Sequence, residues 1–161
     1  MDEKTQVGPL ARTDLRDELH GQARETVAGG ASCTLGGSVP DTPGAFYPIT
    51  VLDEVPPNTP GYADELFGPV ASIIPCADEA DGIRIANDTS FGLGAAVMTG
   101  DPERGRRIAT EELNAGACFV NGGVKSDPRL PFGGIKDSGY GRELGRLGIH
   151  EFVNAKTVWV K

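Results

Sequence analysis

The sequence has few of the residues that form metal sites and disulfide frameworks. Its 161 residues include three cysteines and two histidines, and no two cysteines form a CxxC pair. An odd number of separated cysteines argues against a disulfide framework, and two histidines are too few for an ordinary zinc site. We therefore expect no metal site and a reduced, cytoplasmic setting. Cys33, Cys76 and Cys118 each follow or interrupt an apolar segment, so we expect small buried side chains, above all at Cys76 and Cys118.

Long apolar runs and concentrations of positive charge are also missing. No stretch approaches the roughly 18 apolar residues of a membrane helix, and the charged N-terminus does not resemble a signal peptide. The formal net charge is −8, and no segment concentrates lysine and arginine, which argues against nucleic acid as a partner. A hydrophobic content of 39% and a charged content of 24% are ordinary for a globular domain. We expect neither a membrane nor a nucleic-acid partner.

Glycine, by contrast, is abundant between Asn121 and Gly145. Seven of these 25 residues are glycine and two are proline, yet charged, aromatic and apolar residues are mixed among them. The glycine-rich segment (residues 121–145) follows an apolar, strand-like run and contains Pro131-Phe132-Gly133-Gly134. A flexible linker is rarely so mixed, whereas long ordered loops usually belong to a binding or active site.

The hydrophobic pattern predicts alternating helices and strands. The expected helices cover residues 13–28, 78–87 and 101–113, and the expected strands cover residues 33–35, 47–52, 70–75, 94–99, 117–121 and 158–160. Strands that alternate with helices of about ten residues indicate βαβ units. The sequence therefore predicts an α/β fold with a mostly parallel sheet flanked by helices.

Local signals set the expected ends and faces of two helices. Thr13 is a candidate N-cap for the first helix, whose inner face would carry Leu15, Leu19, Ala23 and Val27 at i, i+4 spacing. Asp101 is the candidate N-cap of the last of the three helices, because an acidic residue followed by proline is typical of a helix start.

Further motifs accompany the glycine-rich segment. They are, in chain order, Val7-Gly8-Pro9-Leu10, Gly44-Ala45-Phe46-Tyr47-Pro48, Glu65-Leu66-Phe67-Gly68-Pro69-Val70, Ala86-Asn87-Asp88-Thr89 with Gly92-Leu93, Ser138-Gly139-Tyr140-Gly141-Arg142-Glu143 and Lys156-Thr157-Val158-Trp159-Val160. Together they resemble the C-terminal third of the aldehyde dehydrogenase superfamily, over essentially the whole chain. Residues 124–134 (VKSDPRLPFGG) and 151–160 (EFVNAKTVWV) look most like bacterial succinate-semialdehyde dehydrogenases.

The resemblance implies a domain organisation. Residues 1–150 would be the C-terminal part of an aldehyde dehydrogenase catalytic domain, and residues 151–161 a terminal oligomerisation strand. Family members begin with a dinucleotide-binding domain, followed by a glutamate general base and a Gly-Gln-x-Cys nucleophile motif. None of these precedes Met1, and Gly21-Gln22-Ala23-Arg24 has arginine where the cysteine would stand. We therefore expect the dinucleotide-binding domain to be absent and these 161 residues to be inactive alone.

The resemblance also implies a cofactor, NAD or NADP, which the 161 residues alone would bind weakly or not at all. By position, Glu65 would hydrogen-bond the nicotinamide ribose hydroxyls, and Phe67 would pack near the nicotinamide ring. A carboxylate suits two neighbouring hydroxyls because it accepts charge-assisted hydrogen bonds. The alternative is a glutamate at a helix end and a phenylalanine in the core. The sequence does not separate NAD from NADP.

Three residues of the glycine-rich segment are implied at the substrate. Ser126, flanked by Lys125 and Arg129, would bind the distal carboxylate of a semialdehyde; the two cations are alternatively solvated loop charges. Phe132 would line the substrate tunnel or, alternatively, anchor the turn that follows it. Asn121 ends a strand, where α/β sheets place functional side chains, and its alternative is a simple turn residue.

One residue is a candidate for the chemistry itself. Glu143 matches a family glutamate thought to help relay protons from the general base. Because it stands beside Arg142, it is equally a candidate for a structural ion pair.

Two hypotheses follow for the whole chain. In the first, it is part of an NAD(P)-dependent enzyme that oxidises an aldehyde, succinate semialdehyde by resemblance, through a cysteine thiohemiacetal and hydride transfer. In the second, it is a non-catalytic assembly module that docks on aldehyde dehydrogenase subunits. The expected partners are a small aldehyde and either further copies of the chain or a complementing N-terminal piece.

Overall fold

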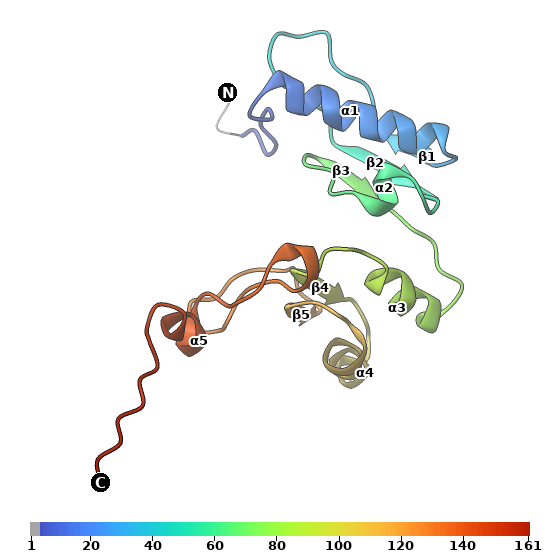
Figure 1. Cartoon of the computed structure of the whole chain (residues 1–161). Coiled ribbons are helices and arrows are strands. Elements are labelled where there is room, and N and C mark those ends of the chain that lie inside the picture. The colour runs from blue at the N-terminus through green and yellow to red at the C-terminus, as the bar shows by residue number, and fades with distance from the viewer. Residues whose placement is uncertain (1–3) are drawn as a thin grey trace. The chain divides into compact units, whose positions relative to one another are not determined.

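The computed structural model describes residues 4–161, and the chain divides into two compact units, Met1–Cys76 and Ala77–Lys161 (Figure 1). The elements of the first unit are α1 (Thr13–Ala28), β1 (Ser32–Leu35), β2 (Thr50–Asp53), α2 (Pro60–Ala63) and β3 (Val70–Ser72). Those of the second unit are α3 (Glu79–Asn87), β4 (Gly94–Val97), α4 (Pro102–Arg107), the π-helix η1 (Ile108–Glu112), β5 (Ala117–Val120), the 3₁₀-helix η2 (Lys136–Ser138) and α5 (Gly145–His150). No helix among residues 4–161 is long and apolar enough to cross a membrane.

The first unit is a three-stranded sheet covered by α1. The strand order is β1-β2-β3; β1 and β2 are antiparallel, and β2 and β3 are parallel. Figure 1 shows α1 lying along this sheet. Its core consists of Ala23 from α1, Ala31, Leu52 from β2, and Val55. Burying these apolar side chains is what holds a helix of modest amphipathicity on a small sheet.

The second unit contains a βαβ crossover. Strands β4 and β5 are parallel, with Gly94 opposite Ala117 and Val97 opposite Val120, and α4 connects them in sequence. A side chain on Gly105 of α4 would place its Cβ 2.7 Å from Val120 Cγ1, so glycine lets this helix approach β5 closely. Two of the three strand pairs formed by residues 4–161 are parallel. The expected α/β class with a mostly parallel sheet is confirmed.

The helix signals were partly right. Asp101 caps α4 as expected, because its Oδ1 accepts hydrogen bonds from the backbone N–H groups of Glu103 and Arg104, both at 3.1 Å. Thr13, however, is not a cap. The N-cap of α1 is Arg12, which makes no side-chain capping hydrogen bond, and its guanidinium pairs instead with Asp14.

The inner face of α1 also differs from the expected one. Leu19 and Ala23 are buried, but Val27 is 40% exposed and Thr26 is fully buried in its place. The Thr26 hydroxyl donates to the Gln22 carbonyl at 2.8 Å and accepts from the Gly61 N–H at 2.8 Å. A buried hydroxyl with both functions satisfied costs little. Apolar periodicity therefore missed a polar residue that joins α1 to α2.

The C-terminal tail, residues 151–161, forms no strand. Val158, Trp159 and Val160 are between 75% and 86% exposed, and the tail extends away from α5 (Figure 1). A β-strand needs hydrogen bonds from a neighbouring strand, and within residues 4–161 none pairs with this segment. The terminal oligomerisation strand stays a prediction, because only a partner chain could complete it.

Candidate functional site

The glycine-rich segment is attached to the loop between α3 and β4 by three hydrogen bonds. The backbone N–H of Ile135 donates to the Gly92 carbonyl, and that of Asp137 donates to the Ser90 carbonyl, both at 3.0 Å. In return, the Gly92 N–H donates to the Ser138 hydroxyl at 2.9 Å. These contacts order a part of the segment that composition alone would allow to be flexible.

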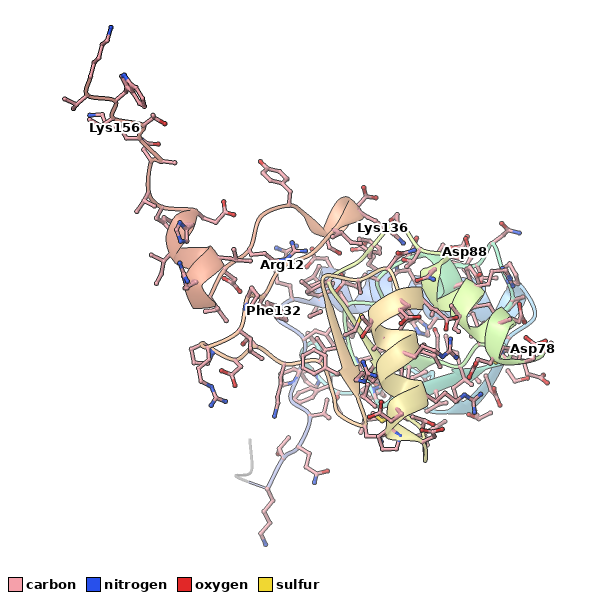
Figure 2. All side chains as sticks on the ribbon, turned by 90° about the horizontal axis from the view of Figure 1, so that it is seen from below. Arg12, Asp78, Asp88, Phe132, Lys136 and Lys156 are labelled. Atoms are coloured by element: carbon pink, nitrogen blue, oxygen red, sulfur yellow. The ribbon has the colours of Figure 1, made fainter. Side chains whose placement is uncertain are left out.

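Lys136 strengthens the same attachment. Its ammonium donates to the carbonyls of Asn87 and Thr89 at 3.0 and 2.9 Å, beside the C-terminal end of α3 (Figure 2). Helix C-termini favour cations because their carbonyls carry partial negative charge. The Asn87 amide in turn donates to the Glu112 carbonyl and accepts from the Asn114 N–H, both at 2.8 Å. Asn87 and Lys136 therefore hold the region together and do not point to a ligand.

The segment also lies directly against the beginning of β5. A Cβ added to Gly116 would come 1.7 Å from the carbonyl oxygen of Gly133, so no other residue fits there without moving the backbone. Gly134, the next residue, is buried. The Phe-Gly-Gly part of the motif thus makes a close backbone packing contact, which is a use for glycine that requires no ligand.

Phe132 and Glu143 are brought together by their backbones. Each N–H donates to the other's carbonyl at 2.8 Å, forming an antiparallel bridge. The guanidinium of Arg142 donates to the carbonyls of Gly134 and Gly141 at 2.8 and 2.6 Å. Arg142 and Glu143 do not form an ion pair among the described residues 4–161. The structural ion pair expected as one alternative for Glu143 is therefore wrong.

Asn121 follows β5 and has a left-handed backbone, with φ of 53°, a conformation that asparagine tolerates better than most residues. Its Oδ1 accepts from the Thr99 N–H at 2.8 Å, and its Nδ2 donates to the Thr99 carbonyl at 2.9 Å. The side chain thus ties the residue after β5 to the chain after β4. The second Nδ2 proton is left for another acceptor.

The loop around Ser126 contains a carboxylate that the sequence analysis overlooked. Asp127 accepts two hydrogen bonds from the Arg129 guanidinium, at 2.9 and 2.6 Å, and one from the Arg129 N–H at 2.9 Å. The bonds from the Arg129 side chain, then that from its N–H, lower the pKa of Asp127 from 3.8 to about 2. Ser126 and Lys125 are exposed. Of the two flanking cations, Arg129 is neutralised by Asp127.

Two cavities meet at Phe132. One, of about 330 Å³, lies between β5 and the loop, and Cys118, Lys125, Asp127 and Leu130 contribute to its wall. The other, of about 480 Å³, includes Glu143 in its wall. Phe132, labelled in Figure 2, borders both cavities and is half-buried. This placement agrees with both readings of the residue, as a cavity wall and as an anchor for the turn.

The cysteines are less buried than expected. Cys33 and Cys76 are exposed, so the expectation of buried thiols was wrong for both. For Cys76 the reason is that the hydrogen bonds joining this segment to β2 and Val55 end at Ile73, so Cys76 lies beyond the sheet. Cys118 on β5 is half-buried, and burial raises the pKa of its thiol. A raised pKa lowers the thiolate fraction at neutral pH, which disfavours Cys118 as a nucleophile.

Glu65 and Phe67 belong to the first unit. Glu65 is exposed and lies two residues beyond the end of α2. Phe67 is 73% exposed, so the alternative of a core phenylalanine is wrong. Gly68 explains the exposure: its added Cβ would come 2.4 Å from Leu19 Cδ2, and its N–H donates to the Leu66 carbonyl at 2.8 Å. This tight turn packs against α1 and leaves the aromatic ring outside.

Comparison with known proteins places this architecture in a family. The model of the aldehyde dehydrogenase family matches residues 1–158, and the chain belongs to that family. It is 52% identical over 156 residues to the probable succinate-semialdehyde dehydrogenase (NADP(+)) of Synechocystis sp.. It is 47% identical over 158 residues to the succinate semialdehyde dehydrogenase (NAD(P)+) Sad of Escherichia coli. These alignments cover 97% and 98% of this chain but 34% of each relative.

Solved structures agree. The succinic semialdehyde dehydrogenase of Streptococcus pyogenes in complex with NADP+ matches with a TM-score of 0.94 and 36% identity, over 99% of this chain and 35% of that one. An aldehyde dehydrogenase of Mycobacterium tuberculosis complexed with NAD+ matches with a TM-score of 0.88 and 37% identity, over 94% of this chain and 31% of that one. The chain therefore spans about a third of the length of its relatives.

The Asp127–Arg129 pair makes the pH behaviour of the loop testable. Because the folded pKa of Asp127 is lowered, the pair stabilises the loop fully above the ordinary value of 3.8, and this stabilisation is lost as the pH falls toward 2. Carboxyl NMR of Asp127 should titrate with a midpoint of about 2. In Arg129→Met the midpoint should rise toward 3.8, and in the control Arg106→Met it should not move. A midpoint near 3.8 in the unaltered chain would disprove the pairing.

Proposed function

We propose that the chain is part of an NAD(P)-dependent aldehyde dehydrogenase that oxidises succinate semialdehyde to the acid. The observation that carries this proposal is the 52% identity to a probable succinate-semialdehyde dehydrogenase over 97% of the chain. A site on an ordered loop supports it, because the glycine-rich segment is fixed to the loop before β4 and to the start of β5. The free cysteines fit a reducing compartment, and we propose the cytoplasm.

In this proposal Glu65 and Phe67 hold the nicotinamide end of NAD or NADP. The carboxylate accepts hydrogen bonds from the two ribose hydroxyls, and the exposed ring of Phe67 packs on the nicotinamide. The cofactor, when bound, accepts the hydride from the substrate. The exposure of both side chains supports the assignment, since neither is used in packing. The names of the relatives include both NADP(+) and NAD(P)+, so the choice of cofactor stays open.

Residues of the second unit form part of the substrate wall in the same proposal. The Ser126 hydroxyl donates to the distal carboxylate of the semialdehyde, Phe132 lines the tunnel, and Asn121 uses its remaining amide proton. Glu143 helps to move a proton to or from the general base. The cavity that Phe132 and Glu143 both line and the bridge between their backbones support a common location for these two residues.

The nucleophile is not supplied by these residues. Aldehyde oxidation would start from a thiolate that attacks the carbonyl carbon to form a thiohemiacetal, and a bound nicotinamide would supply the hydride acceptor. Burial raises the pKa of the Cys118 thiol and so disfavours the thiolate. Cys33 and Cys76 do not stand in a Gly-Gln-x-Cys motif. The Gly-Gln-x-Cys motif and the general base would come from residues beyond these 161.

The function can be tested by completing the enzyme. The 161-residue polypeptide alone should not oxidise succinate semialdehyde with either cofactor. A chimera in which it replaces the matching third of Escherichia coli Sad should reduce NAD(P)+ with succinate semialdehyde, measured at 340 nm. Sad lacking that third is the matched control. A folded chimera that binds cofactor but oxidises no aldehyde would refute the proposed function. If the 161 residues alone oxidised the aldehyde and Cys118→Ser abolished this activity, the claim that they supply no nucleophile would be refuted.

The role of Ser126 predicts a substrate-dependent defect. In the chimera, Ser126→Ala removes a hydrogen bond to a charged group, a loss of about 1–2 kcal/mol. The kcat/KM for succinate semialdehyde should fall accordingly, whereas that for butyraldehyde should hardly change. Equal losses for both aldehydes would assign Ser126 to a structural role.

The exposed tail favours a second function, that of an assembly module. Phe152 and Trp159 are 89% and 86% exposed, and short apolar strands without a partner tend to pair with another edge. We propose that residues 151–161 add to a sheet of another aldehyde dehydrogenase subunit.

Light scattering on the 161-residue chain, and on the same chain ended after Glu151, tests the tail. The intact chain should self-associate and the truncated one should be monomeric. A monomeric intact chain whose Trp159 fluorescence reports a buried indole would contradict the proposal.

A further inference from the structure

Three charged side chains lie close together in sequence around the cavity of about 330 Å³ between β5 and the loop. Lys125 and Asp127 contribute to its wall, together with the apolar side chains of Leu130 and Phe132. Arg129 does not line this cavity; it pairs with Asp127, and 85% of its side chain is exposed.

The charges of Asp127 and Arg129 cancel each other. Their contact is bidentate, with Nε and Nη2 of Arg129 donating to the two oxygens of Asp127 at 2.9 and 2.6 Å. Such fork-like pairs direct both partners toward each other and leave little charge for a third group. Among the described residues 4–161, Lys125 forms no ion pair. Lys125 is then the cation in the wall of this cavity that is not held in a bidentate pair, although its charge also acts on Asp127, whose pKa it helps to lower.

We propose that Lys125 is a specificity-determining residue, which selects aldehydes that carry a carboxylate at the end distal to the aldehyde group. This inference rests on the proposed function. Ser126 is not part of this cavity's wall, and Lys125 would add a positive charge to the hydrogen bond that the Ser126 hydroxyl offers the same carboxylate. A lysine suits the task because its ammonium is a compact charge on a flexible stem. Lys125 is exposed, so solvent and salt screen its charge, and the expected preference is modest and depends on salt.

The arrangement also rejects an alternative. Arg129 is the more obvious carboxylate receptor by residue type, since guanidinium groups bind carboxylates with two hydrogen bonds. Here the edge formed by Nε and Nη2 already binds Asp127, which leaves only the outer edge of the guanidinium for a ligand. A ligand carboxylate would find the charge of Arg129 already balanced by a bidentate carboxylate outside the cavity, whereas Lys125 lines the cavity and forms no bidentate pair.

The test uses two isosteric probes that differ in charge, butyrate and butyramide, titrated into the ¹⁵N-labelled 161-residue chain. Backbone amide signals of Lys125, Leu130 and Phe132 should shift with butyrate, which should bind about fivefold more tightly than butyramide. In Lys125→Met the two probes should bind alike, and Lys125→Arg should keep the preference. Lys161→Met, the same change of charge at the exposed C-terminus, is the matched control and should behave as the unaltered chain. The preference should weaken as salt is added.

In the chimera, Lys125→Met should lower the kcat/KM for succinate semialdehyde about fivefold relative to butyraldehyde. Equal binding of both probes by the unaltered chain, or an unchanged preference in Lys125→Met, would overturn the inference and leave the proposed function standing. If the chimera oxidises no aldehyde, the proposed function fails, and the probe titration still decides whether Lys125 selects carboxylates.

Discussion

The close contact between Gly116 and Gly133 is the constraint on which the second unit depends. With a carbonyl oxygen at the position of a missing Cβ, the backbone of the glycine-rich segment lies directly on the beginning of β5. Further along the same segment, backbone hydrogen bonds join it to Ser90 and Gly92, and the Lys136 ammonium donates to the Asn87 carbonyl. Phe132, which immediately precedes this contact, borders both cavities.

The first unit also contains a close packing contact at a glycine. The turn at Gly68 presses against Leu19 of α1, and this contact turns the ring of Phe67 outward. In both units, therefore, glycine serves backbone packing, and the packing exposes or places a neighbouring aromatic side chain. Phe67 and Phe132 lie beside tight turns that pack on α1 and on the beginning of β5. Rigid elements position loop residues in this way.

Charge in the candidate substrate loop is organised by pairing. Composition alone shows two cations beside Ser126, but Asp127 neutralises one of them and leaves the other. The pair also sets a pKa of about 2 for the carboxylate, so the loop keeps its charge pattern throughout the neutral range. A cation left in the wall of a partly apolar cavity discriminates ligands by charge more than by shape.

The sequence alone was enough for features that depend on neighbours within a few residues. The Asp101 cap, the strand–helix–strand order of β4, α4 and β5, and the family resemblance of the glycine-rich segment are of this kind, because caps, periodicity and motifs are local patterns. Features set by distant contacts required the tertiary structure. Thr26 is buried because Gly61 lies against it, Phe67 is exposed because Gly68 packs on Leu19, and Cys76 is exposed because the hydrogen bonds of the sheet end at Ile73. Whether a side chain is buried, and which residue it contacts, depends on the segments that pack against it. The sequence pattern of one segment does not say where a distant segment lies.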